Sequence, residues 1–168
     1  MIKYGGLYLP PSLMINLIKI IPIVWAFSAL AWTRFEAFPQ ANFQASKREK
    51  CVFFHPWASW CEPCLKELPE IVSWLNGEKR VTALVLDLST PFVQESFSKS
   101  FMRNLKPQFL TYLRPDSIDE KNYINAWSQD WQGELPYSEL YVRGSRKKVW
   151  KGRVKLKELR REVAALCK

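Results

Sequence analysis

Two cysteines, Cys61 and Cys64, lie two residues apart in the segment WASWCEPC at residues 57–64. An apolar segment typical of a buried strand precedes them, and a segment with helical periodicity follows. A thiol at a helix N-terminus is stabilised as the thiolate by free N–H groups and the helix dipole, which favours Cys61 as a nucleophile. Cys64 lies one turn further along, where it can attack a mixed disulfide on Cys61. Pro63 suits this first turn because its missing N–H would be unpaired there.

A zinc site and an inert structural pair are the alternatives to redox chemistry. Cys51, His55, Cys61 and Cys64 have ligand-like spacing. However, four residues of strand span about 13 Å, so Cys51 and His55 could not both reach one ion. His55 is the single histidine of the chain, which excludes a His-rich metal site. The spacing therefore favours thiol–disulfide chemistry.

Two elements position this pair. Residues Cys51–Trp57 are predicted to form a short buried strand, and Cys61–Asn76 a helix, with Gly77 as the first residue beyond its end. Pro69 is expected to kink the helix, because it removes one backbone hydrogen bond. The apolar residues of this helix recur at helical spacing: Leu65, Leu68, Ile71, Val72 and Leu75.

The remaining pattern alternates strands and helices, which predicts an α/β fold. After Thr90-Pro91, a helix is expected to bury one apolar face, made of Val93, Phe97, Phe101 and Leu105. The other predicted elements are strands over Val81–Leu88 and Phe109–Leu113, helices over Asp119–Trp131 and Lys155–Lys168, and a hairpin of Leu140–Arg143 and Lys147–Lys151 around Gly144-Ser145.

Residues 1–31 are predicted to be a signal peptide or a membrane anchor. The apolar run Ile20–Trp32 has the length of a signal-peptide core, and Ala29-Leu30-Ala31 would allow cleavage before Trp32. If Lys19 snorkels, Leu13–Trp32 could instead span a membrane uncleaved. A buried cytosolic helix is a third alternative, and Met14 would give a more conventional start. Residues 32–50 are expected to be a linker and edge segment.

Composition excludes several classes of protein. The 24 aromatic residues and the 48% hydrophobic content exclude a disordered chain, and four cysteines are too sparse for a disulfide-stapled mini-protein. Residues 143–168 hold 11 basic and 2 acidic residues, which is the whole net charge of +9. We interpret this region as a solvated surface, or as a patch for a membrane or an acidic protein. A nucleic-acid partner is not expected, because no nucleic-acid motif is present.

The sequence resembles the thioredoxin superfamily, and within it the exported thiol–disulfide reductases of the TlpA/ResA type. Beside WASWCEPC, the matching features are Pro69 in LKELPE, Leu135-Pro136 before the strand SELYV, and Gly152 after the hairpin. The resemblance implies a thioredoxin-like fold over residues 51–168, with a central mixed sheet flanked by helices.

The resemblance also implies roles for individual residues. Cys61 would be the exposed nucleophile and Cys64 the resolving thiol, and Glu67 would handle protons. The alternative for Glu67 is a solvated helix residue. A cis peptide before Pro136 would receive the substrate backbone, and the docking surface would also include Trp60 and Leu135. The redox group would be the Cys61–Cys64 disulfide itself, without a cofactor.

The implied activity is reduction of protein disulfides outside the cytoplasm, in the periplasm or from a membrane anchor. The substrate would be a protein disulfide, such as that of apocytochrome c, and an upstream membrane or soluble thiol would supply electrons. The alternatives are metal binding with copper delivery, and non-catalytic docking, both on the same fold. A peroxidase is disfavoured because the usual residues around its cysteine are missing.

Three residues near the motif are candidates for tuning the cysteine pair. Glu62 and Pro63 lie between the cysteines, and the Glu62 carboxylate should make the pair more reducing by opposing thiolate formation. His55 either tunes the pair or is a core histidine bonded to the backbone. His55-Pro56 and Tyr137 are departures from the residues that the family usually has at these places.

The other two cysteines, Cys51 and Cys167, are expected by default to be unpaired thiols. Cys51 begins the strand whose far end carries the redox pair. In a thioredoxin-like fold the last helix runs back toward the start of that strand, so a second disulfide is the alternative.

Overall fold

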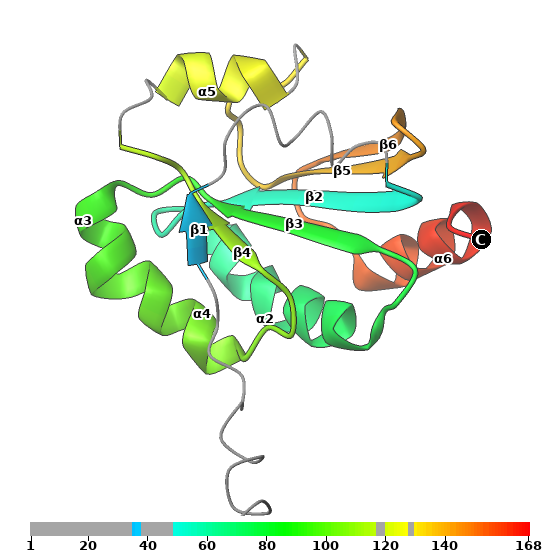
Figure 1. Cartoon of the computed structure of the whole chain (residues 1–168), viewed down its shortest axis with the longest axis horizontal. Helices are drawn as coiled ribbons and strands as arrows, with labels where there is room; N and C mark the ends of the chain where they lie inside the picture. The colour runs from blue at the N-terminus through cyan, green and yellow to red at the C-terminus, as the bar shows by residue number, and fades with distance from the viewer. Residues whose placement is uncertain (1–34, 38–48, 117–119, 128–129) are drawn as a thin grey trace, which may run out of the picture. The chain divides into compact units, whose positions relative to one another are not determined.

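A mixed sheet is the centre of the computed structural model, which describes residues 35–37, 49–116, 120–127 and 130–168 (Figure 1). Among these residues, six strands lie in the order β1-β4-β3-β2-β5-β6. Neighbours from β1 to β2 are parallel, whereas β5 and β6 pair antiparallel. The mixed sheet predicted from the sequence is thereby confirmed. The strands are β1 Phe35–Ala37, β2 Cys51–Trp57, β3 Thr82–Asp87, β4 Thr111–Leu113, β5 Tyr137–Val142 and β6 Ser145–Lys151.

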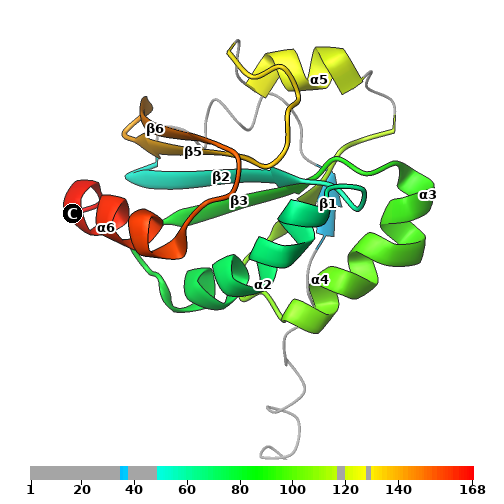
Figure 2. The same cartoon turned by 180° about the vertical axis from the view of Figure 1, so that it is seen from behind.

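Helices cover both faces of the sheet. Figures 1 and 2 show α2, α4 and α6 on one face and α5 on the other. Side chains of β2 alternate between two apolar clusters, because successive residues of a strand point to opposite faces. Phe53 and Trp57 pack with α2, α4 and α6, whereas Val52 and Phe54 pack with α5. The helices are α2 Glu62–Gly77, α3 Pro91–Val93, the π-helical η3 Gln94–Ser98, α4 Lys99–Leu105, α5 Glu120–Trp127 and α6 Leu156–Leu166.

Helix α2 follows its prediction closely. Cys61 is the N-cap, and the helix runs through Pro69 to Gly77. Gly77 is the last helical residue and not the first residue beyond the end, so the predicted stop was one residue early. The inner face is buried as expected, and it includes Cys64 and Glu67.

The β5–β6 hairpin turns one residue earlier than predicted. Val142 pairs with Ser145, so Arg143 and Gly144 are the two turn residues. Both have positive φ, 50° and 79°, as a two-residue hairpin turn of type I′ requires. Ser145 therefore belongs to β6, because the positive-φ pair and not the Gly-Ser dipeptide sets the register.

The prediction for the inner face after Thr90 was right for Phe101 and Leu105, which pack partly buried against the core, and wrong for Phe97. Phe97 is 40% exposed, and the buried residues are Gln94, Ser98 and Met102. The Gln94 side chain donates to the Ser89 carbonyl at 2.9 Å. Hydropathy does not detect such hydrogen bonds, so it did not identify the polar Gln94 and Ser98 as buried residues.

Helix α5 is shorter than the predicted Asp119–Trp131. Trp131 lies outside it, fully buried, and its ring stacks on Tyr137 with centroids 5.2 Å apart. The predicted signal peptide or anchor over residues 1–31 lies outside the described residues. Within the part of the chain that the structure describes, no helix is long and apolar enough to cross a membrane.

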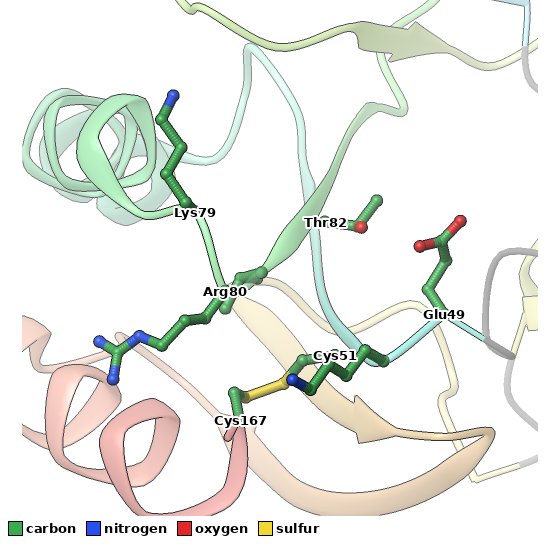
Figure 3. Close-up of a pocket in the computed structure, with 8 residues that line it drawn as sticks. Glu49, Cys51, Lys79, Arg80, Thr82 and Cys167 are labelled. Atoms are coloured by element: carbon green, nitrogen blue, oxygen red, sulfur yellow. A yellow bond between two sulfur atoms is a disulfide. The ribbon is translucent and has the colours of Figure 1, made fainter.

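A second disulfide joins Cys51 to Cys167, so the default expectation of two unpaired thiols was wrong. Their Cα atoms are 5.6 Å apart, within the range for a disulfide. Cys51 and Cys167 line a surface pocket of about 250 Å³. Figure 3 shows the bond among the lining residues, which include Arg80 and Glu49. The bond ties the end of the chain to the first residue of β2, at the opposite end of that strand from Cys61.

Replacing Cys51 and Cys167 by alanine should lower the free energy of unfolding by about 2–5 kcal/mol, because a bond between distant residues restricts the unfolded chain. The sequence separation is 116 residues. Guanidinium unfolding measures the change. The matched control is the Cys61→Ala/Cys64→Ala variant. The bond that it removes has a sequence separation of only 3 and therefore restricts the unfolded chain little. Equal unfolding midpoints for the two double variants would contradict this prediction.

Candidate active site

The Cys61–Cys64 disulfide lies at the N-terminus of α2, with Cα atoms 5.2 Å apart. The Cys61 Sγ accepts the Cys64 N–H at 3.3 Å, and the Cys61 N–H donates to the Ala58 carbonyl at 3.0 Å. One backbone donor of the first helical turn, the Cys64 N–H, is therefore directed at the Cys61 sulfur, as a thiolate there needs. Cys61 is 4% exposed and Cys64 is fully buried. The order of exposure agrees with the prediction, but in the disulfide state Cys61 is buried and not exposed.

The peptide bond between Leu135 and Pro136 is cis, as the resemblance implied. Strand β5 pairs with β2 through Phe54 and Glu139. Continuing this register places Pro136 opposite Trp57, at the end of β2 from which the loop to Cys61 leaves. The Pro136 carbonyl accepts the Gly152 N–H at 2.8 Å, which holds the segment against the start of the last loop. Leu135 and Pro136 therefore lie at the same edge of the sheet as the disulfide.

Below the disulfide, His55 and Glu67 are buried side by side, with His55 Nε2 3.9 Å from Glu67 Oε1. His55 Nδ1 is hydrogen-bonded to the Ser138 hydroxyl at 2.8 Å, and not to the backbone. Glu67 Oε2 accepts the Val154 N–H at 2.8 Å. Burial lowers the pKa of His55 to about 4 and raises the pKa of Glu67 to about 7, because it disfavours the charged form of each. Glu67 is thus a buried acid and not a solvated helix residue.

A polar cluster supports the loop that carries Cys61, and the sequence analysis did not identify it. The Ser59 N–H donates to the Ser89 hydroxyl at 2.9 Å, and the Ser89 N–H donates to Asp87 Oδ1 at 2.8 Å. Asp87 is buried at the carboxyl end of β3, and burial raises the pKa of its carboxyl group. The one available signal was a serine two residues after each of the neighbouring strands β2 and β3, Ser59 after Trp57 and Ser89 after Asp87.

Exposed aromatic side chains lie near the same edge of the sheet. In the described residues, Trp60 is 64% exposed and Phe92 is 81% exposed. By contrast, Trp57 is buried, and its ring lies 5.7 Å from that of Phe101. Trp60 is therefore available for contact with another molecule, whereas Trp57 belongs to the core.

The tuning candidates between the cysteines are both exposed. The Glu62 carboxylate forms an ion pair with Lys66 at 2.6 Å, and this partner lowers the Glu62 pKa. The Lys66 cation weakens the electrostatic field of Glu62 at Cys61, so the effect of Glu62 on the reduction potential of the cysteine pair should be small. Pro63 occupies the first turn of α2, as expected.

The residues of the alternative zinc site are not brought together. Cys51 is bonded to Cys167 at the far end of β2, away from the Cys61–Cys64 bond. No group of three or more potential metal ligands occurs within residues 35–37, 49–116, 120–127 and 130–168. In the basic region 143–168, several cations are paired within the protein: Arg146 with Glu139 and Asp130, Lys148 with Glu158, and Lys151 with Glu134.

Comparison with solved structures identifies the fold. A secreted disulfide oxidoreductase of Mycobacterium tuberculosis, described as homologous to DsbE of E. coli, matches with a TM-score of 0.57 and 20% identity. The match covers 73% of this chain and 86% of that one. The chain has a thioredoxin-like fold.

Two further thioredoxin-like structures match over similar lengths. A thiol:disulfide interchange protein of Chlorobium tepidum has a TM-score of 0.57 and 17% identity, covering 74% of this chain and 85% of its own. StoA of Bacillus subtilis has a TM-score of 0.51 and 23% identity, covering 68% and 82%. No protein-family model and no curated protein matches the sequence.

Ser89→Ala should slow the opening of the Cys61–Cys64 disulfide by added dithiothreitol by about threefold to tenfold, the effect of one lost hydrogen bond. The Ser59 N–H loses its acceptor, so the loop before Cys61 is held less firmly. Stopped-flow tryptophan fluorescence measures the rate.

Ser96→Ala is the matched control, because its hydroxyl bonds only the Phe92 carbonyl on the exposed side of the helix. Ser89→Thr keeps the acceptor and should restore the rate. Equal rates for Ser89→Ala and Ser96→Ala would show that the Ser89 hydroxyl does not position the loop.

Proposed function

We propose that this chain is a thiol–disulfide oxidoreductase that reduces protein disulfides outside the cytoplasm. The observation that carries the proposal is the disulfide of Cys61 and Cys64 at a helix N-terminus, at the sheet edge that also holds cis-Pro136. A purely structural disulfide does not need the donors of a helix N-terminus, whereas a reactive thiolate does.

The reaction is a pair of thiol–disulfide exchanges. In the reduced protein, the Cys61 thiolate attacks one sulfur of a substrate disulfide and forms a mixed disulfide, while the other substrate sulfur leaves as a thiolate. Cys64 then loses its proton and attacks Cys61, which releases the second substrate thiolate. Two electrons pass to the substrate, and the Cys61–Cys64 bond forms. An upstream dithiol then reduces the Cys61–Cys64 bond again. Glu67 is the buried group nearest to Cys64 in sequence that can carry the proton of Cys64.

Substrate docking is proposed at the edge formed by Leu135, Pro136 and Trp60. The cis-proline segment precedes β5, and an extended substrate segment could lie along it and approach Cys61. Trp60 adds an exposed aromatic surface directly before the nucleophile. We propose that Phe92, exposed at the start of α3, also belongs to this docking surface, because α3 follows the end of β3, the strand beside β2.

An extracytoplasmic location is supported by two observations. The Cys51–Cys167 disulfide lies outside the redox pair, and structural disulfides persist mainly in oxidising compartments. The Mycobacterium tuberculosis protein of the same fold is described as secreted. Within this location, a membrane or soluble thiol would supply electrons, and apocytochrome c is the substrate we propose first.

Cys64→Ser should accumulate a covalent mixed disulfide with its protein substrate through Cys61. The variant completes the first exchange but lacks the thiol for the second. Non-reducing electrophoresis from the native host, followed by mass spectrometry of the trapped partner, measures this product.

Cys61→Ser is the matched control and should trap little, because the remaining Cys64 is fully buried. Added dithiol should dissolve the Cys64→Ser product. If Cys61→Ser trapped partners as well as Cys64→Ser does, the assigned roles would be wrong. An identified partner other than apocytochrome c would revise the substrate and leave the reaction unchanged.

Phe92→Ser should reduce kcat/KM for a polypeptide disulfide such as insulin by about threefold to tenfold, because about 1 kcal/mol of apolar contact is lost. Reduction of the small hydroxyethyl disulfide should be unchanged. Lys79→Ser, an exposed position at the opposite end of the sheet, is the control. An equal loss for both disulfides would place Phe92 outside the docking surface.

A further inference from the structure

Glu139 is a carboxylate in the middle of β5 that is 0% exposed. Its Oε1 accepts the Tyr137 hydroxyl at 2.6 Å and Arg146 Nη1 at 2.9 Å, and its Oε2 accepts the Tyr141 hydroxyl at 2.6 Å. The three β5 side chains point to one face of the sheet, because side chains alternate along a strand. This is the face that α5 covers, where both tyrosines pack. Three donors, one of them a cation, therefore satisfy a charge that would be very costly to bury without partners.

Net stabilisation does not explain such a cluster. Apolar side chains of similar volume often stabilise a buried site as well as an ion pair does, or better. What directed hydrogen bonds add is a fixed position for each donor. The donors of Glu139 come from the start of β5, from near its other end and from β6. The carboxylate therefore fixes these three places relative to one another.

Arg146 extends the cluster to the segment that leads to the docking surface. Its Nη1 donates to Glu139, and its Nη2 donates to the exposed Asp130. The hydrogen bonds with Asp130 and Glu139 raise the pKa of the guanidinium, which stays a cation. Asp130 is the first of residues 130–136, and Pro136 is the last. The guanidinium thus ties the start of this segment to a fixed carboxylate in the core.

Trp131 provides a second link between Glu139 and the same segment. The buried Trp131 ring stacks on the Tyr137 ring, with centroids 5.2 Å apart, and the Tyr137 hydroxyl is bonded to Glu139. Trp131 Nε1 in turn donates at 2.9 Å to the carbonyl of Glu134, the residue before Leu135. The two links hold the segment near its start and near its end.

We propose that Glu139 is a positioning residue for substrate docking. Through Arg146 and Tyr137 it holds residues 130–136, and it thereby fixes the docking edge at Pro136. That a polypeptide disulfide binds at this edge rests on the proposed function, whereas the anchoring does not. The Glu139 cluster lies on the α5 face, and the cysteine pair belongs to the apolar cluster on the other face. Glu139 should therefore affect the binding of a large substrate and not the chemistry of the cysteines.

Asp130→Ala removes the outer link without disturbing the core, because the Asp130 side chain is 67% exposed. In the oxidised protein, the backbone amides of residues 131–135 should exchange their hydrogens about threefold to tenfold faster, the effect of one lost hydrogen bond. Deuterium exchange followed by mass spectrometry of peptides from this segment measures the change. Asp130→Glu keeps the carboxylate and should restore the slow exchange.

Glu158→Ala is the matched control, because its ion pair with Lys148, at 3.1 Å, joins β6 to α6 on the other face of the sheet. This variant should leave the exchange of residues 131–135 unchanged. Equal exchange rates for Asp130→Ala and Glu158→Ala would overturn the link through Arg146.

Two tyrosine variants separate positioning from stability. Tyr137→Phe and Tyr141→Phe each remove one hydroxyl donor from Glu139 and keep the ring. A role in stability alone predicts similar effects for both variants. Positioning predicts faster exchange of residues 131–135 in Tyr137→Phe, because Tyr137 stacks on Trp131. Tyr141 lies near the other end of β5, so its variant should accelerate this exchange less. Equal acceleration by the two variants would overturn the role of Glu139.

Steady-state reduction of insulin tests the consequence for docking. In Asp130→Ala, the KM for insulin should rise about threefold to tenfold, while kcat and the reduction of hydroxyethyl disulfide stay at the values of Glu158→Ala. Faster hydrogen exchange with an unchanged KM would overturn the docking role. Faster hydrogen exchange in a protein that reduces no disulfide would reject the proposed function and leave the anchoring by Glu139 in place.

Discussion

The complete burial of β2 is the constraint on which the rest of the structure depends. All seven side chains of Cys51–Trp57 are buried, because β3 and β5 cover its edges and helices cover its faces. Its alternation points His55 toward the face that α2 covers, where Glu67 lies. Its carboxyl end starts the short loop to Cys61, and its neighbour β5 brings cis-Pro136 to the same edge. One strand thus positions the disulfide, the docking segment and the buried acid together.

The features that sequence patterns identified are local ones. Cys61 and Cys64 are separated by two residues at a helix start, and Leu135-Pro136 directly precedes a strand, so neighbouring residues carry the information. The hydrophobic periodicity of α2 was similarly informative, because its inner face meets an apolar core over several turns.

The features that were missed depend on contacts between distant segments. The pairing of Ser59 with Ser89 requires the register of β2 with β3. The Cys51–Cys167 bond was only the alternative to two unpaired thiols, because it depends on where α6 ends relative to β2. After Thr90, hydropathy identified Phe101 and Leu105, which pack against the core, but not the buried Gln94 and Ser98, whose polar groups lie beside Ser89. His55 could be singled out as the only histidine, but its partners come from β5 and α2 and are not evident in the sequence.

The central claim is that Cys61–Cys64 is the disulfide that exchanges, whereas Cys51–Cys167 is structural. Equilibrating the protein in dithiothreitol buffers of graded potential, alkylating the free thiols in acid, and mapping the labelled peptides by mass spectrometry tests this claim most directly. The account predicts one two-electron transition in which Cys61 and Cys64 become labelled together, while Cys51 and Cys167 stay paired until more reducing conditions. Opening of the Cys51–Cys167 bond first, or of both bonds at one potential, would contradict it.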